Sequence, residues 1–381
     1  MSKTIKYVGF YDVENSRYAR QSCLAAVNKM NYLIEKLNQM GYSVHLVSPS
    51  WYVVPDASFT KKKEIIVHDN LKITFAPSFP TRNRYTKYLK ILLTIVWLFF
   101  YLLCHVHRNE EIIVYHSPAF LRVINLAKSI KGFKVILEVE EIYTNVGNFT
   151  RAFIEKEMRF IASADKYFFS TELLEEKLNP SRKPYAIYYG VYKAEMDRGD
   201  QFDDDKIHLV YAGTFCRHKK GAYTAVATAC FLDEKYHLHI LGFGSPSEIK
   251  EIQTYIQEVQ EKTACTISYD GLLSGENYIR FLQKCDVGLS TQTPVGVYNE
   301  TSFPSKILPY LANGLRVVTI DIEVVRRFQL SNILYCYKTD NPSDVANVIK
   351  EIHWNGSYDS REAMNKLDED FEINLSIMLR N

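Results

Sequence analysis

Short apolar runs and longer stretches of helical periodicity alternate along most of the chain. Residues 5–11 and 42–48 are typical of buried strands, and residues 22–40 between them carry apolar positions at helical spacing up to Gly41. The second half repeats this alternation, with apolar runs that predict strands at 207–212, 237–241, 266–269, 287–290 and 316–320. Strands that alternate with helices form parallel sheets, so the pattern predicts an α/β fold.

The length of the chain suits two domains. Its 381 residues exceed one typical domain, and a hydrophobic content of 47% is enough for two full cores. A polar stretch at 195–206 holds three consecutive aspartates and is the expected linker, with the aspartates solvated and not bound to metal. We therefore expect domains at 1–195 and 206–355, followed by a C-terminal helix within 356–381.

Charge and cysteine usage argue against several classes of protein. The chain has 46 basic and 44 acidic side chains and a net charge of +2, so no basic excess supports nucleic-acid binding. Its seven cysteines form no CxxC pattern, and we expect reduced, mostly buried thiols with neither a disulfide framework nor a zinc site. The first residues enter a predicted strand without a signal-peptide pattern, so we expect a cytoplasmic protein.

One segment, residues 82–106, combines cations with apolar residues. An apolar run at 91–104 follows four cations, which are Arg82, Arg84, Lys87 and Lys90. The run is shorter than the roughly 20 residues of a spanning helix, which makes a transmembrane span the least favoured interpretation. A fully buried helix and a helix with one edge on an anionic membrane surface both stay open. We favour the membrane-facing edge, because the cations cluster on one side of the run.

The stretch 299–319 carries the strongest local signals. Pro304 suits the first turn of a helix, where its missing N–H needs no partner, and Asn313 with Gly314 supplies a left-handed stop. The free N–H groups and the positive dipole end of such a helix, together with Ser305, would hold phosphate without a metal. An ordinary helix-to-strand connection of an α/β domain explains the same residues.

A second turn places cations at the end of a strand. The predicted strand at 207–212 leads into Gly213, which lets the backbone turn closely, and then into Arg217 and Lys220. Cations at the carboxyl end of a parallel strand suit a phosphate ligand. A basic surface turn would explain the charges but not their position after the glycine.

These two features resemble the donor domain of GT-B glycosyltransferases, especially the retaining family 4 type of bacterial polysaccharide gene clusters. The resemblance is carried by SFPSKIL at 302–308, by YLANG at 310–314 and by the basic turn after Gly213. It implies two Rossmann-like domains that face each other across a cleft, with the C-terminal helix crossing back to the first domain. The implied donor-binding residues are Gly213, Lys220, Arg217, Gly242, Gly244, Ser302, Phe303, Ser305 and Lys306.

The sequence departs from the family pattern at two acidic positions. Family members carry one acid just before the Phe of the motif, facing the donor sugar, and a second one eight residues later, on the ribose. Strict spacing puts Thr301 and Pro309 at these positions, with Glu300 displaced by one residue. We expect Glu300 to replace the first acid through a one-residue shift of the loop. The ribose contact has to come from elsewhere or be absent, because Pro309 has no side-chain acceptor.

The first half supplies the candidate acceptor side. A polar loop after the first predicted strand contains Glu14 and Asn15, which we expect near the acceptor, although a solvated loop is an equal alternative. The strand that ends near Glu138 continues into Glu140 and Glu141, and crowding of these carboxylates would raise a pKa. We expect Glu140 or Glu141 to contact the acceptor hydroxyl. A helix cap or an ordinary ion pair explains them equally well.

The resemblance implies a retaining, metal-independent hexosyltransferase that uses no cofactor. Its substrates would be a nucleotide-sugar of the UDP type and a polyprenyl-linked saccharide at the inner face of a bacterial membrane, in capsule or O-antigen biosynthesis. The implied catalytic residues are Glu300, Lys220, Arg217 and Glu141. Two alternatives remain: a GT-B-fold sugar-nucleotide epimerase, and a non-catalytic GT-B partner subunit, which Thr301 and Pro309 keep open.

Overall fold

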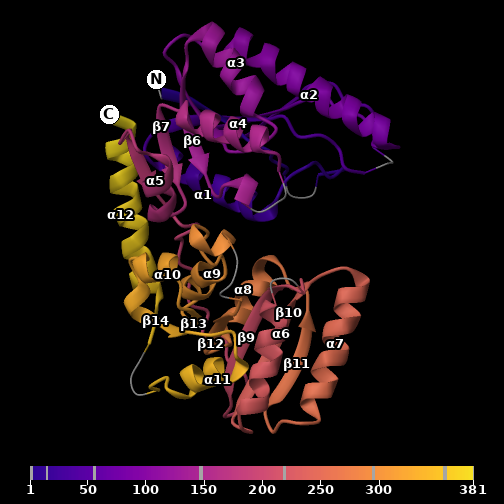
Figure 1. The fold of residues 1–381 in the computed structure, drawn as a ribbon, viewed down its shortest axis with the longest axis vertical. Coiled ribbons are helices and arrows are strands. Elements are labelled where there is room, and N and C mark those ends of the chain that lie inside the picture. The colour runs from indigo at the N-terminus through magenta and orange to yellow at the C-terminus, as the bar shows by residue number, and fades with distance from the viewer. Residues whose placement is uncertain are drawn as a thin grey trace. The chain divides into compact units, whose positions relative to one another are not determined.

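The structure is a computed structural model that describes residues 3–13, 16–54, 57–145, 149–217, 220–293, 297–354 and 358–380. The chain forms two compact units (Figure 1). Unit 1 comprises Met1–Val191 together with Phe371–Asn381, and unit 2 comprises Tyr192–Asp370.

Unit 1 is built on an eight-stranded sheet with the order β3-β4-β2-β1-β5-β6-β7-β8. All neighbouring strands are parallel except β3, which runs antiparallel to β4. The strands are β1 (Lys3–Val8), β2 (Tyr42–Ser48), β3 (Lys63–His68), β4 (Leu71–Phe75), β5 (Glu111–Tyr115), β6 (Lys134–Val139), β7 (Lys166–Phe169) and β8 (Tyr185–Ile187). The central strands are apolar on both faces, as strands covered by helices on both sides must be.

The helices of unit 1 include α1 (Leu24–Gln39), α2 (Arg84–His105), α3 (Leu121–Lys131), α4 (Arg151–Ala162) and α5 (Glu172–Leu178). The last helix, α12 (Arg361–Arg380), starts in unit 2 and ends in unit 1. In unit 1 its Phe371 ring stacks on Tyr188 at 4.9 Å and on Tyr32 at 5.8 Å between ring centroids. The end of the chain is therefore part of the core of the unit that contains its beginning.

Unit 2 holds a six-stranded sheet that is parallel throughout, with the order β11-β10-β9-β12-β13-β14. Its strands are β9 (Ile207–Thr214), β10 (Tyr236–Phe243), β11 (Thr266–Gly271), β12 (Val287–Ser290), β13 (Arg316–Ile320) and β14 (Leu334–Tyr337). Its other helices are α6 (Gly221–Thr228), α7 (Pro246–Gln260), α8 (Gly275–Gln283), α9 (Ile307–Ala312), α10 (Glu323–Arg327) and α11 (Pro342–Lys350). The strand order reverses between β9 and β12, which is where doubly wound sheets bind ligands.

The predicted α/β class is confirmed, and β2, β12 and β13 begin and end where their apolar runs predict. The hairpin of β3 and β4 was not predicted. Its first strand is mostly exposed and lies at the edge of the sheet, so its sequence lacks a buried apolar run. The thiol prediction is wrong in part, because only Cys265 and Cys285 are fully buried among the seven free cysteines.

The helix predicted in 299–319 begins later than expected. Pro304 and Ser305 lie in a turn, in which the Pro304 carbonyl accepts the Ile307 N–H at 3.2 Å, and α9 starts at Ile307. The left-handed stop is confirmed at Gly314, whose φ is +85°. The helix is six residues long, so the loop before it, and not a long helix dipole, shapes this end of the sheet.

Helix α2 is longer than its apolar run, because Asn83 and Thr86 form a capping box that starts the helix at Arg84. It is long and apolar enough to cross a membrane by length and composition. Leu98 and Leu102 are fully buried in the core of unit 1, so one side of α2 packs on the protein. The other side carries exposed apolar side chains, which are Tyr85, Tyr88, Leu89, Leu92, Leu93, Val96 and Phe100. The interpretation of α2 as a fully buried helix is wrong.

Candidate functional site

Unit 2 has a hollow of about 100 Å³ at the carboxyl ends of β9 and β12. Three segments that are distant in sequence form it: the end of β9 with the start of α6, the residues after β12, and the loop before α9. The lining residues are Tyr211, Thr214, Gly221, Thr291, Gln292, Asn299, Ser302, Phe303, Pro304, Ser305 and Lys306. Four of the predicted donor-binding residues, Ser302, Phe303, Ser305 and Lys306, are thus brought together.

Lys306 brings a positive charge to this hollow. Its Nζ lies 5.0 Å from the centre of the Tyr211 ring, over which a cation is attracted by the π electrons. Its side chain also crosses Gly213, where an added Cβ would lie 2.5 Å from Lys306 Cε. Gly213 therefore leaves the space through which the lysine reaches the strand end, which is a physical role for the glycine that the sequence singled out.

Helix α9 is held to the sheet through Tyr310. The backbone N–H of Ala212 donates to the Tyr310 hydroxyl at 2.8 Å, and the ring is fully buried. The same ring lies against Gly288, where an added Cβ would approach Tyr310 Cγ to 2.2 Å. This packing fixes the loop that precedes α9 at the end of β9.

Two further glycines bring β9 and β10 together at their ends. Gly242 pairs with Gly213 in the parallel register and has a φ of +151°, a conformation that side chains rarely adopt. An added Cβ on Gly242 would lie 1.8 Å from the Gly213 carbonyl oxygen. Gly244 lies just beyond, beside the Ser245–Glu248 capping box of α7. The GxG pattern at 242–244 thus serves a close backbone approach and the start of a helix.

The other predicted donor residues lie around the hollow and not in its lining, as far as the described residues go. Arg217 is exposed, and its guanidinium donates to Glu251 at 2.8 Å. Interaction with Tyr223 and then with Glu251 raises the pKa of Arg217. Lys220 is exposed and precedes the lining residue Gly221, with left-handed backbone at φ +52°. Glu300 is exposed at the end of a 3-10 turn (Val297–Glu300), between the lining residues Asn299 and Ser302.

On the acceptor side, Glu14 and Asn15 lie outside the described residues. Glu140 is in an ion pair with Lys29, at 2.6 Å and 2.8 Å from Lys29 Nζ to the two carboxylate oxygens. Its partner is a lysine of α1, so Glu140 forms the ordinary ion pair that we kept as an alternative. Glu141 is half-buried just after β6.

The pKa increase that we expected for the clustered carboxylates falls on Glu138. This side chain is fully buried on β6 and accepts hydrogen bonds from the hydroxyls of Tyr7 and Tyr188. Burial, followed by repulsion from Glu140, raises the pKa of Glu138 to about 7. A buried carboxyl enclosed by two tyrosines and packed beside the C-terminal helix is a feature of the core.

Comparison with known proteins identifies the architecture. No family model matches the sequence, and no curated protein is significantly similar to it. Among solved structures, it is similar to sucrose-phosphate synthase from Thermosynechococcus elongatus, with a TM-score of 0.68 and 14% identity over 99% of this chain and 98% of that chain. A trehalose-6-phosphate protein of E. coli bound with UDP-2-fluoro glucose gives a TM-score of 0.68 at 9% identity, over 98% of this chain and 96% of that chain.

A third solved structure, HepE of Anabaena in complex with UDP and glucose, matches with a TM-score of 0.62 and 9% identity over the full length of both chains. The chain has the GT-B fold. At these identities the likeness shows the fold alone, and the family 4 assignment stays a prediction.

The GT-B hollow in unit 2 includes residues that sequence reasoning missed. Thr291 and Gln292 follow β12, and the Thr291 hydroxyl donates to the Gly221 carbonyl at 2.7 Å. Gln292 Nε2 donates to Asn299 Oδ1 at 3.0 Å, which joins two lining segments. The available signal was their position at the carboxyl end of a predicted strand. Pro309 lies within α9, and its carbonyl accepts from the Asn313 amide at 2.8 Å.

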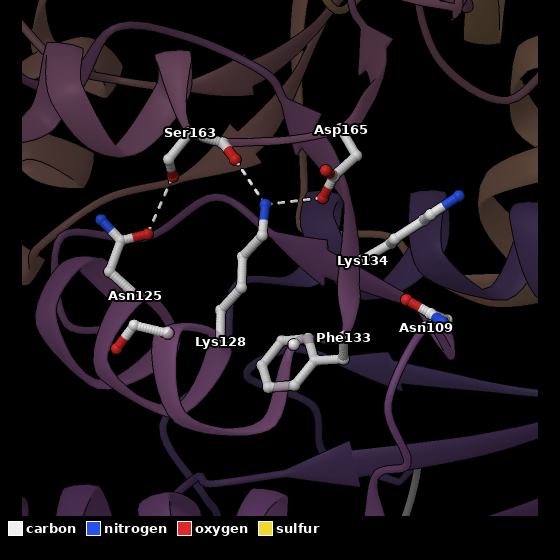
Figure 2. Close-up of a pocket in the computed structure, with 9 residues that line it drawn as sticks. Asn109, Asn125, Lys128, Phe133, Lys134, Ser163 and Asp165 are labelled. Carbon is white, nitrogen blue, oxygen red and sulfur yellow. Dashed lines mark hydrogen bonds and ion pairs between the residues drawn. The ribbon is translucent and has the colours of Figure 1, made fainter.

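A second, more open hollow of about 550 Å³ lies in unit 1 (Figure 2). Lys128 Nζ donates to Asp165 Oδ2 and to the Ser163 carbonyl, both at 2.6 Å, and the Ser163 hydroxyl donates to Asn125. Four of its polar lining residues are thus engaged with one another. The hollow lies beside Lys134, at the amino end of β6, which is the opposite end from the one where GT-B sheets and other α/β sheets bind ligands.

Proposed function

We propose that this chain is a glycosyltransferase that binds the diphosphate of a nucleotide-sugar in the hollow of unit 2. One observation carries the proposal: the loop 302–306 places Lys306 in a hollow at the carboxyl ends of β9 and β12, in a GT-B fold. A volume of about 100 Å³ is smaller than the roughly 300–1,000 Å³ of whole-ligand sites. We therefore assign the hollow to the diphosphate and not to the complete donor.

We propose UDP as the nucleotide. Two of the similar solved structures hold UDP or a UDP-sugar, and both cover nearly the full length of this chain. Gln292 and Asn299 line the hollow and are our candidates for the ribose contact that Pro309 cannot make, although in the structure their amides bond to each other. The identity of the sugar depends on few side chains and is open to direct assay.

The proposed transfer needs no divalent metal and no cofactor. When the bond between the sugar and the diphosphate breaks, the diphosphate leaves with the electron pair and gains negative charge. Lys306 in the hollow and Lys220 beside it would stabilise this charge, which is the largest single contribution in many transfer reactions. Glu300 remains the candidate for the contact with the donor sugar, and Glu141 or Glu140 for the acceptor hydroxyl. Retention of configuration stays an expectation from the family 4 resemblance.

For the acceptor we propose a lipid-linked saccharide, presented to the protein at the cytoplasmic face of a membrane. The support lies on α2, whose exposed apolar stripe includes Leu92, Leu93 and Phe100. Arg84 and Lys87 are exposed on its first turns, where they suit anionic headgroups. Lys90 does not belong to this cationic group. It is buried, and its ammonium donates to the Tyr52 carbonyl and the Thr81 hydroxyl, while burial lowers the pKa of Lys90 to about 8.

The packing of α2 favours lying on a membrane over crossing it. A spanning helix is surrounded by lipid or by other spanning helices, whereas Leu98 and Leu102 are fully buried in the core of unit 1. Lipid would reach only the stripe that is exposed in the folded unit. This is the geometry of an interfacial helix with one apolar face.

A turnover assay tests the proposed function. The purified chain is incubated with UDP-sugars and either lipid-linked saccharides or sugar phosphates, and UDP release is followed with Lys306→Met beside the wild type. We expect acceptor-dependent UDP release that falls by at least about 100-fold in Lys306→Met, the scale of losing one transition-state charge contact. Lys262→Met, an exposed lysine beyond α7, is the control that should keep full activity.

The outcomes separate the alternatives. Conversion of one UDP-sugar into its isomer without any acceptor would establish an epimerase and contradict the proposal. Binding of UDP without turnover on any acceptor would support the non-catalytic partner subunit. Release that depends on a sugar phosphate, as the names of the similar proteins from Thermosynechococcus elongatus and E. coli suggest, would keep the transferase and replace the lipid-linked acceptor.

A further inference from the structure

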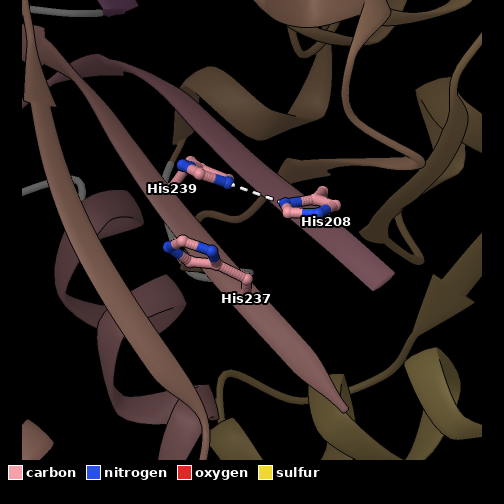
Figure 3. A group of neighbouring side chains, drawn as sticks. All are labelled: His208, His237 and His239. Carbon is pink, nitrogen blue, oxygen red and sulfur yellow. Dashed lines mark hydrogen bonds between the residues drawn. The ribbon is translucent and has the colours of Figure 1, made fainter. Parts of the chain in front are cut away.

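Three histidines cluster on one face of the sheet in unit 2 (Figure 3). His208 lies near the start of β9, and His237 and His239 lie on β10, with His208 and His237 paired in the parallel register. One ring nitrogen from each lies within 4.8 Å of the other two. His208 and His239 are buried, and His237 is half-buried. His208 lies 29 positions before His237 and on a different strand, so no linear spacing marked the three residues as a group.

Each ring is held by an oxygen on one of its nitrogens. His208 Nε2 lies 2.7 Å from Asp204 Oδ1, and His239 Nδ1 lies 3.2 Å from Asp270 Oδ2. His237 Nε2 lies 2.7 Å from the Ser268 hydroxyl. Asp204 belongs to the aspartate run that we expected to be solvated; it is exposed, and its carboxylate also bonds to His208. Metal-ligating histidines are typically oriented in this way, through a carboxylate or other acceptor on the second nitrogen.

The contact between the two buried rings suits a cation. His208 Nδ1 and His239 Nε2 face each other at 3.0 Å. In neutral rings whose outer nitrogens donate to the carboxylates, both of these inner nitrogens are acceptors, so their lone pairs would repel. A proton or a metal ion between the nitrogens converts this repulsion into attraction. A shared proton would join only His208 and His239. A metal ion would also bind the third histidine, His237, which brings the number of nitrogen ligands to three.

We propose that His208, His237 and His239 bind a divalent transition metal ion of the zinc class. Zn–N bonds of about 2.0–2.1 Å place tetrahedral ligand nitrogens about 3.3 Å apart, close to the 3.0 Å between His208 and His239. His237 would supply the third ligand nitrogen after a rotation of its half-buried ring. Imidazole ligands suit zinc, copper and nickel, and disfavour magnesium and calcium, which prefer oxygen.

The site is remote from the proposed chemistry. His208 is six residues before Thr214, which lines the hollow, and six residues of strand span about 20 Å. The Phe202 ring stacks on His208 at 4.0 Å and on His239 at 4.9 Å between centroids, covering the cluster from the segment before β9. A bound ion would therefore stabilise unit 2 by joining β9, β10 and this segment, and would take no part in sugar transfer.

Metal titration tests the proposal on the full, untagged chain after treatment with EDTA. We expect one equivalent of Zn²⁺ to bind in calorimetry with micromolar or tighter affinity and to raise the melting temperature. One equivalent of Co²⁺ should give the visible absorption of a tetrahedral nitrogen site. His237→Gln and His239→Gln should each weaken binding at least tenfold, and His353→Gln, an exposed histidine of unit 2, should bind as the wild type does.

Two results would overturn the proposal. One is wild-type binding weaker than millimolar, which would leave a shared proton as the cation in the cluster. The other is equal binding by the wild type and His237→Gln, which would assign the ion to another site. Circular dichroism establishes that each variant is folded. The ring of His237 is half-buried, so His237→Gln is expected to fold even if the variant of the buried His239 does not. Metal binding by His237→Gln then decides whether the cluster is the site. Neither result affects UDP binding in the hollow of unit 2 that contains Lys306, so a failure of the metal site and a failure of the proposed function can be told apart.

Discussion

The backbone N–H of Ala212 donates a hydrogen bond to the hydroxyl of Tyr310 over 2.8 Å. Strands β9 and β12 pair through Leu209 with Val287 and Val210 with Gly288, and Ala212 lies two residues beyond this pairing. Tyr310 from α9 supplies the missing acceptor and places its ring over Gly288. One side chain thus joins the sheet, the helix and the loop that carries Lys306.

Tyr310→Phe should weaken both the fold and the donor site. Removing the hydroxyl leaves the Ala212 N–H without its acceptor, which costs about 1–3 kcal/mol of unfolding free energy. Because α9 positions the loop 302–306, we also expect UDP affinity to fall several-fold. Urea unfolding and calorimetry measure the two effects. Tyr269→Phe, on β11 with its ring packed near Phe215, is the matched control, and equal effects of both variants would argue against this anchoring role.

Gly242→Ala should be strongly destabilising. The added Cβ would meet the Gly213 carbonyl oxygen at 1.8 Å and would also have to adopt a φ of +151°. We expect a loss of about 2–4 kcal/mol, which combines backbone strain with overpacking. Gly271→Ala separates the two causes, because its φ is +76° and an added Cβ there has nothing within 4 Å. Equal melting temperatures for the two variants would contradict the close approach of β9 and β10.

Unfolding of unit 1 should depend on pH through Glu138. Its pKa is raised to about 7 in the folded protein, so between about pH 4.5 and 7 the folded state holds a proton that the unfolded state releases. The contribution of Glu138 to stability is therefore present at low pH and is lost as pH rises through 7, by at most about 3 kcal/mol. We expect the wild type to lose more stability than Glu138→Gln between pH 5 and pH 8 in thermal melts. Parallel pH profiles of the two proteins would refute the assignment.

Binding to vesicles should depend on the exposed stripe of α2 and on lipid charge. We expect the chain to sediment with phosphatidylglycerol vesicles and less with phosphatidylcholine. Leu92→Ser combined with Leu93→Ser should weaken binding at least tenfold, since each leucine loses about 1.5–3 kcal/mol of apolar burial. Lys87→Gln should weaken it about fivefold, the effect of one cation near an anionic surface.

The control for the vesicle experiment is Ile377→Ser. Ile377 is a similarly exposed apolar residue on α12 in unit 1, with 54% of its surface accessible. If this control loses as much vesicle binding as the α2 variants, the stripe is not the membrane-binding surface. Equal sedimentation with both lipids would remove the electrostatic part of the proposal.

The sequence predicted what depends on local apolar pattern, and missed what depends on packing between segments. Apolar runs located β12 and β13, because these strands are buried on both faces. The start of α9 was misplaced, since Pro304 is equally suited to a turn and to a first helical turn. Lys90 was grouped with surface cations, although the carbonyl of Tyr52, 38 residues earlier, accepts its hydrogen bond in the interior.

The candidate site shows the same division. The motif at 302–306 could be found from the sequence because its residues are consecutive. The contributions of Gln292 and Thr291 depend on β12 lying beside β9, which no local pattern reports. The histidine cluster likewise needs the pairing of β9 with β10 before its three rings become neighbours.

Calorimetry of UDP binding by the wild type and by Lys306→Met tests whether the hollow of unit 2 holds the diphosphate. Methionine keeps the length of the side chain over Tyr211 and removes its charge. We expect the wild type to bind UDP and Lys306→Met to lose at least about tenfold in affinity, because a charged contact to phosphate is lost, while Lys262→Met binds normally. Wild-type affinity for UDP in Lys306→Met would contradict the placement of the diphosphate in this hollow.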